Sequence, residues 1–326
     1  MKKFTLVIHI IIYFIFSGCS PIEQIQTEIL EPGEIKIPQK ITSGVLILSE
    51  PENEFELVED EEFPALIIEE MKYGLADVLE NSPRFESDEL IIPEKEEIKK
   101  YLEKDSLRWI DMKRIADQFN VDAVFLMDKF TLDSSMEDDK VYEQGSLYYY
   151  ITFKIVSNAR WRIYYPYQDL LVDEYNYSEK FIWDALGADK SSAARQLPDY
   201  KKAFFEAGYW TGHDYAERIL PIWREDKRTY YIRGTNELRE AKEYVDENNW
   251  EKAIETWKIN LEHPDREIAS RAAYNIAFAF EMMGDINKAL KWAERSQNIK
   301  NKERTLEFIE NLKQREEKIL ELEEQL

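Results

Sequence analysis

The sequence predicts an α+β fold, in which a small α/β domain with an antiparallel hairpin extension is followed by an all-α helical domain. Two observations lead to this prediction. Between residues 43 and 190, short apolar runs alternate with amphipathic helical patterns and then give way to long β patterns. From Gly234 onwards, apolar residues recur at helical spacing, and one pattern returns 36 positions later. A chain of 326 residues is long enough for two such domains.

The amino terminus has the layout of a secretory signal peptide. Two lysines precede an apolar run from Phe4 to Phe16, and two small residues lead to Cys19. The apolar run has 13 residues, whereas a membrane-spanning helix needs about 20. We therefore predict that residues 1–18 are a cleaved signal peptide.

Cys19 is the only cysteine of the chain, and it stands where such a signal would be cut. The segment Phe16-Ser17-Gly18-Cys19 resembles the lipobox of bacterial lipoproteins. This resemblance implies cleavage before Cys19 and attachment of lipid to its thiol and new amino group, which would anchor the protein to a membrane. The alternatives are an ordinary cleaved signal with a chance cysteine, and an uncleaved anchor.

The charge balance restricts the partners. Without residues 1–18 the chain has 41 basic and 66 acidic residues, a net charge of −25. Nucleic acids and anionic membrane surfaces bind basic patches, so this balance opposes both. We therefore expect the lipid, and not the surface charge, to hold the protein at a membrane. A single cysteine permits no intramolecular disulfide, so packing must provide the stability.

The α/β pattern follows a proline-containing segment, residues 19–42, which we predict to be a tether. Gly44–Leu48 has the composition of a buried strand, and the eight acids within residues 50–62 indicate a solvated loop. The patterns that follow predict helices at 63–79, 94–102 and 111–119, and strands at 85–92, 121–127, 147–156, 161–165 and 170–177. The four residues 166–169 would connect the last two strands as a hairpin.

Two stretches of this region carry a resemblance: Ile115 to Leu132, and the strand-turn-strand segment from Ala159 to Tyr175. They resemble the small α/β domain of envelope lipoproteins such as the curli secretion lipoprotein, the penicillin-binding-protein activator lipoprotein and the amino-terminal part of the Tol translocation protein. The likeness covers residues 45–180. It implies a fold, and a fold does not determine a function.

Residues 191–233 are predicted to be a helical connector, and residues 234–300 two helix pairs. The segment from Asn249 to Ile254 matches that from Asp285 to Leu290, and small and aromatic residues agree in the preceding helices. These residues resemble tetratricopeptide repeats, the alternative being a plain pair of helical hairpins. Residues 301–326 are predicted to form a helix that caps the repeats. Its apolar seam, broken by Arg315, leaves a short coiled coil as the alternative.

The sequence offers few candidates for chemistry. His213 beside Asp214 is a weak candidate base, because no nucleophile or metal ligand accompanies it in the sequence. We predict no catalytic residues, no metal site and no cofactor. Asp133, Glu137, Asp138 and Asp139 are expected in a solvated acidic loop, since the glycine and the final glutamate of a calcium loop are missing. Paired carboxylates for glycoside cleavage remain open, because no pair stands out among the acids.

Two surfaces are candidates for binding. The first helix of the second pair would line the concave face of a repeat array, so Arg271, Tyr274, Phe278 and Glu281 are candidate contacts for a peptide or helix, although some could only pack the neighbouring repeat. Aromatic side chains crowd the predicted hairpin and could stack on sugar rings, although strand packing explains them as well. They are Tyr148, Tyr149, Tyr150, Trp161, Tyr164, Tyr165 and Tyr167.

Taken as a whole, the chain resembles a Bacteroidetes-type envelope lipoprotein family of unknown function. We therefore expect a non-enzymatic lipoprotein of the cell envelope, anchored through lipid on Cys19, in the outer membrane of a Gram-negative bacterium. It would bind envelope protein partners through the repeats and no nucleic acid. A glycan-binding accessory lipoprotein is the first alternative, and a carboxylate-dependent hydrolase is the second.

Overall fold

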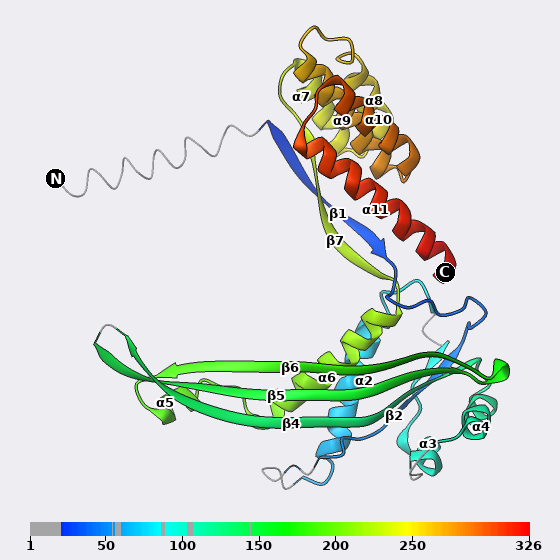
Figure 1. Cartoon of the computed structure of the whole chain (residues 1–326), viewed down its shortest axis with the longest axis vertical. Helices are drawn as coiled ribbons and strands as arrows, with labels where there is room; N and C mark the ends of the chain where they lie inside the picture. The colour runs from blue at the N-terminus through cyan, green and yellow to red at the C-terminus, as the bar shows by residue number, and fades with distance from the viewer. Residues whose placement is uncertain (1–20, 54, 56–59, 86–88, 103–106, 144) are drawn as a thin grey trace. The chain divides into compact units, whose positions relative to one another are not determined.

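The computed structural model describes residues 21–53, 55, 60–85, 89–102, 107–143 and 145–326. These residues form two compact units. Residues 30–223 and 322–326 form an α/β unit, and residues 21–29 and 224–321 form a helical unit that includes a two-stranded sheet. Sheets and helices are both present (Figure 1), which confirms the predicted α+β class. None of the helices in the described part of the chain combines the length and the hydropathy that a bilayer crossing requires.

The α/β unit is built on a five-stranded sheet in the order β3-β2-β4-β5-β6. β2 (Gly44–Leu48) is buried along its whole length and pairs in parallel with β3 (Leu90–Ile91) and with the start of β4 (Ala123–Glu143). β4, β5 (Ser146–Tyr165) and β6 (Leu170–Gly187) are antiparallel, and a 3₁₀ turn at Pro166–Gln168 connects β5 to β6 at the predicted position.

Helices pack on both faces of this sheet. On one face, α2 (Phe63–Leu79) and α6 (Tyr200–Ile219) cover a core that includes Leu46 and Leu48 of β2, and the short α5 (Lys190–Ala194) packs on β5 and β6. On the other face, α3 (Lys95–Leu102) and α4 (Trp109–Phe119) cover Val45 and Ile47. A strand with apolar residues at every position fits a sheet that is covered on both sides.

The contact between α2 and α6 depends on glycine. A Cβ atom on Gly74 of α2 would lie 2.0 Å from the backbone oxygen of Tyr209, and one on Gly212 of α6 would lie 2.3 Å from that of Met71. Both distances are far too short for a side chain, so only glycine permits this approach of the two backbones.

β4, β5 and β6 continue well past the part of the sheet that contains β2. The last β2–β4 pair is Leu48 with Met127, and the register of β4 with β5 then shifts between Asp128 and Thr131. We call residues 131–142, 147–158 and 178–187 the arm. Within the described chain, β5 is the only strand that pairs with the two outer strands there, so no further strand covers either edge of the arm.

In the helical unit, each helix packs on the next: α7 (Asn236–Asp246) on α8 (Trp250–Lys258), α8 on α9 (Arg266–Met282), and α9 on α10 (Ile286–Ile299). Ala253 and Ala289 are fully buried, as close helix contacts require. α11 (Glu303–Gln325) adds Phe308 and Leu312 to the same core. β1 (Ile22–Glu31) and β7 (Ile222–Tyr231) form the two-stranded sheet.

Several parts of the fold differ from the predictions. The strands predicted at 147–156 and 161–165 are one continuous strand, β5. The tether predicted at 19–42 is ordered from Pro21 onwards, because β1 pairs with β7 and because Ile37 and Ile41 are buried in the core of the α/β unit. The connector predicted at 191–233 ends in the strand β7. The acidic residues predicted in a loop, Asp133, Glu137, Asp138 and Asp139, lie in β4, where pairing with β5 satisfies the backbone and leaves the carboxylates exposed.

Candidate functional site

In the helical unit, strand β7 packs along helix α9. Asn275 of α9 is fully buried, and its side chain accepts a hydrogen bond from the backbone N–H of Tyr231 at 2.7 Å and donates one to the carbonyl of Tyr231 at 2.6 Å. A side-chain amide that binds both backbone groups of one residue fixes the strand's register without reading its side chains.

The two tyrosines at the end of β7 lie in aromatic surroundings. Tyr230 stacks on Phe278, with ring centroids 5.2 Å apart and ring planes 4° from parallel. Tyr231 meets Tyr274 edge to face, at 5.2 Å. Burial raises the pKa of Tyr274 to about 12, so this phenol stays neutral at physiological pH.

One turn further along α9, Glu281 anchors β7 by charge. Its carboxylate is only 1% exposed and accepts hydrogen bonds from Arg228 Nε of β7 at 2.7 Å and from Arg315 Nη1 of α11 at 2.8 Å. Burial alone would lower the pKa of Arg228, but the neighbouring Glu281 and Asp226 outweigh it and raise that pKa. A buried carboxylate between two guanidinium groups fixes the positions of β7 and α11 on α9. Removing one of the partners would leave a buried charge unpaired.

These contacts involve the four residues that were predicted as a binding surface. Arg271, Tyr274, Phe278 and Glu281 do lie along an extended segment, but that segment is the chain's own β7, and α11 covers what remains. Tyr274, Phe278 and Glu281 are buried, so in this structure they are not available to a partner. The sequence analysis did not identify Asn275 or β7, because residues 191–233 were predicted to be a helical connector. Tyr231 of β7 lies 44 residues before Asn275 in the chain.

The opposite end of α9 gathers cations in an otherwise acidic chain. Glu267 accepts hydrogen bonds from Arg271 Nε at 3.0 Å and Lys302 Nζ at 2.6 Å, and it forms an ion pair with Lys300 Nζ at 2.7 Å. Burial acts to raise the pKa of Glu267, but the hydrogen bonds from Lys300 and Lys302 outweigh it and lower the pKa to about 2. We call the following set of residues the basic end: the cations near this carboxylate, and Arg233, whose backbone carbonyl accepts a hydrogen bond from Arg271. The cations are Arg266, Arg271, Lys300, Lys302 and Arg304.

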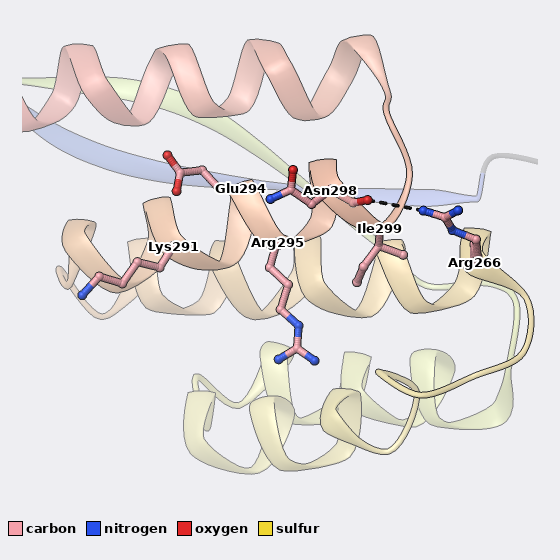
Figure 2. A pocket seen from close by; sticks show the side chains of 6 residues that line it. All are labelled: Arg266, Lys291, Glu294, Arg295, Asn298 and Ile299. Carbon is pink, nitrogen blue, oxygen red and sulfur yellow. Dashed lines mark hydrogen bonds between the residues drawn. The ribbon is translucent and has the colours of Figure 1, made fainter.

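An open hollow adjoins the basic end. Its volume is about 500 Å³, and Figure 2 shows its lining on α9 and α10: Arg266, Lys291, Glu294, Arg295, Asn298 and Ile299. Arg266 Nη2 donates a hydrogen bond to the carbonyl of Asn298 at 3.3 Å, which ties the start of α9 to the end of α10. Three cations and one carboxylate make this hollow a surface for anions rather than for apolar ligands.

A second surface lies on the arm of the α/β unit. On one face, Phe153 stacks on Tyr200 of α6 and Ser157 Oγ lies 2.7 Å from Thr211 Oγ1. On the opposite face, which we call the outer face, Val141 pairs with Tyr148, and Tyr150 has Leu186 as its neighbour. Val141 and Leu186 are each 40% exposed. The helices on that side, α3 and α4, pack on the core around Val45 and Val124, at the other end of the sheet.

Acidic side chains surround this apolar patch. Asp133, Glu137 and Asp139 of β4 and Asp184 of β6 share the outer face with Lys154 and Lys180. The hydrogen bond with Asp184 raises the pKa of Tyr150. Charged edge strands oppose pairing between copies of the same chain. Because the apolar patch of the outer face is surrounded mainly by carboxylates, this face suits a partner that carries apolar and basic side chains.

The aromatic residues predicted as a sugar platform do not form one row. Trp161 is fully buried against Tyr215 of α6, with ring centroids 3.8 Å apart, and Tyr164 is buried as well. Tyr148, Tyr149 and Tyr150 are half-buried, and Tyr167 is exposed beyond the sheet. The alternation of the strand therefore divides the set between core and surface, as strand packing predicts.

His213 and Asp214 do come together in the structure. His213 Nδ1 lies 3.8 Å from a carboxylate oxygen of Asp214, whose other oxygen accepts a hydrogen bond from the Tyr177 hydroxyl at 2.9 Å. Burial raises the pKa of Asp214. Tyr209 stacks on the His213 ring, and Trp210 meets that ring edge to face. Among the described residues, no group of three or more His, Cys, Asp or Glu could hold a metal ion. Cys19 lies outside the described residues.

These features define an α+β protein with a helical unit whose groove is filled by its own strand. The chain belongs to a family that is characterised only as a domain of unknown function (DUF8603), whose model matches residues 49–231. A second domain of unknown function (DUF6340) matches residues 239–314. No curated protein matches the chain. The crystal structure of the hypothetical protein CT253 from Chlamydia trachomatis is similar over 54% of this chain and 96% of that one, with 15% identity and a TM-score of 0.27.

Proposed function

We propose that this protein is a non-enzymatic scaffold of the bacterial cell envelope, anchored to the outer membrane by lipid on Cys19, and that its protein partner binds the outer face of the arm. The anchor is inferred from the lipobox-like sequence before Cys19. The location of the binding surface is inferred from the arm, because the groove of the helical unit is filled by β7.

One observation carries this proposal. The arm exposes Val141 and Leu186 beside Tyr148 and Tyr150 on the face opposite α6, away from the core that α3 and α4 cover. Within the described chain, no further strand pairs with either edge of the arm. Exposed apolar patches with a charged rim mark interaction sites in soluble domains. The surrounding carboxylates select a partner with basic side chains around an apolar centre.

Site-specific photo-crosslinking in living cells tests the proposal. A photoreactive amino acid at Tyr148 should give one discrete adduct, and Leu186→Asp should abolish that adduct while the protein level stays constant. Tyr73 of α2 provides the control position, because it is aromatic and 62% exposed but lies away from the arm. Equal crosslinking from Tyr73, or no adduct from Tyr148, would contradict the proposed surface.

The anchor is tested separately. Mass spectrometry of the mature amino terminus should find an acylated Cys19, and Cys19→Ala should leave the precursor uncut and unacylated. An unmodified terminus at any other residue would refute the lipoprotein part of the proposal and leave the arm unaffected.

A further inference from the structure

The chain enters the helical unit directly beside the basic end. The carbonyl of Pro21 accepts a hydrogen bond from the N–H of Ile232 at 3.0 Å. The next residue is Arg233, whose carbonyl accepts a hydrogen bond from Arg271 Nη1 at 2.9 Å. The Pro21 backbone is therefore one residue away from a member of the basic end.

Aromatic contacts hold the cations of this end in place. Arg271 and Lys302 lie over the ring of Tyr231, at 5.1 Å and 4.9 Å from its centroid. Tyr231 is itself fixed by Asn275. Ile22, at the start of β1, packs on the same core as Phe308 of α11, and Figure 2 shows Arg266 at the start of α9.

The cations of the basic end outnumber the carboxylates that neighbour them in the sequence. The basic end has six basic residues, and the carboxylates next to them in the sequence are Asp265, Glu267 and Glu303. Asp265 accepts a hydrogen bond from the N–H of Glu267 at the start of α9, and Glu267 is shared by three cations. The chain-wide excess of acids lies elsewhere, since residues 224–321 contain 19 basic and 21 acidic residues and the rest contains 24 and 45.

Covalent geometry places Cys19 close to this surface. Consecutive Cα atoms are about 3.8 Å apart, so the Cα atom of Cys19 can be at most about 8 Å from that of Pro21. A lipid on Cys19 would therefore tether the basic end near the headgroups, where charges act over ~10 Å at moderate salt.

We propose that the basic end binds the anionic headgroups of the membrane in which the lipid on Cys19 is inserted. This inference rests on the proposed lipid anchor. Because the chain as a whole is acidic, free protein is repelled by an anionic bilayer, and the basic end acts only once the anchor has brought it to the surface. Anchoring by lipid together with a basic patch is stronger and more oriented than anchoring by lipid alone.

The single cysteine provides a direct test that does not depend on lipidation in cells. The chain from Cys19 onwards is coupled through its thiol to maleimide lipid in vesicles of phosphatidylcholine, or of phosphatidylcholine mixed with phosphatidylglycerol. Acetylation of individual lysines is then followed by mass spectrometry. Lys300 at the basic end and Lys288 at the other end of α10 are 49% and 57% exposed, which makes them a matched pair.

We expect Lys300 to react about threefold or more slowly on the anionic vesicles than on the neutral ones, and Lys288 equally on both. About 1 M salt should abolish the difference, because screening then acts within ~3 Å. Arg266→Gln with Arg304→Gln should reduce the protection, whereas Lys252→Gln with Lys258→Gln on α8 should not.

Equal reactivity of Lys300 on the two kinds of vesicle would overturn the inference, as would equal protection of Lys288. Neither result would bear on the mass of the mature amino terminus, so failure of this inference and failure of the lipoprotein proposal can be told apart.

Discussion

The hydrogen bonds of Asn275 give the sharpest prediction for the helical unit. Asn275→Leu keeps nearly the same side-chain size but removes both bonds to Tyr231, which measure 2.7 Å and 2.6 Å. The buried N–H and carbonyl of Tyr231 would then lose these partners, at about 1–3 kcal/mol each. We expect the free energy of unfolding of the helical unit to fall by roughly 2–6 kcal/mol, a large part of the stability of a typical domain.

Hydrogen exchange measured by mass spectrometry tests this prediction locally. The peptide that contains Tyr231 should exchange much faster in Asn275→Leu, and urea unfolding should shift to lower denaturant concentration. Asn298→Leu is the control, because Asn298 is an exposed residue of α10 and its replacement should change stability by less than ~0.5 kcal/mol. If both variants unfold alike, β7 is not held in the way the structure indicates.

Three further predictions concern stability. Ala289→Trp should overpack the fully buried contact of α10, lower the free energy of unfolding by about 1–3 kcal/mol or more, and lower the thermal midpoint in calorimetry. Gly74→Ala should force α2 away from α6, because its Cβ would lie 2.0 Å from a backbone oxygen, and a drop in melting temperature no larger than that of an exposed helix Gly→Ala change would argue against this contact. The pKa of Glu267 is lowered to about 2, below its unfolded value near 4.5, so its contribution to stability is complete above pH ~4.5 and disappears as the pH falls towards 2. Glu267→Gln should therefore unfold more easily at neutral pH and show a weaker acid dependence in denaturant titrations, and an unchanged dependence would exclude this role.

Local patterns were enough to predict much of the architecture. The helices from Phe63 and from Arg266, and the turn between β5 and β6, follow from apolar spacing and from proline and glycine positions that act within a few residues. Ala253 and Ala289 occupy matching positions in the two repeated segments, and both are fully buried. The lipobox-like segment at Cys19 is also local, and it still provides the sole indication of an anchor.

The parts of the fold that the sequence did not predict depend on partners far away in the chain. The segment of β1 was predicted to be a tether because its strand partner, β7, lies about two hundred residues further along the chain. A single strand pattern with no nearby pairing strand is weak evidence for a sheet. The acidic run of β4 was predicted to be a loop because charged side chains are usually exposed to solvent. An edge strand, however, can expose its side chains to solvent while its backbone pairs with a neighbouring strand.

The sequence alone determined the class of fold, the position of the helices and the candidate lipid site, because helical patterns and signal sequences depend on residues that are close together in the chain. Only the tertiary structure decided which of the candidate binding residues are exposed and which are buried. In the tertiary structure β7 packs along α9, and Tyr274, Phe278 and Glu281 are buried. Cations from α9, from α11 and from the segments that follow β7 and α10 form the basic end. Those outcomes depend on hydrogen bonds and ion pairs between segments that are separate in sequence, and these pairings become visible only when the chain is folded.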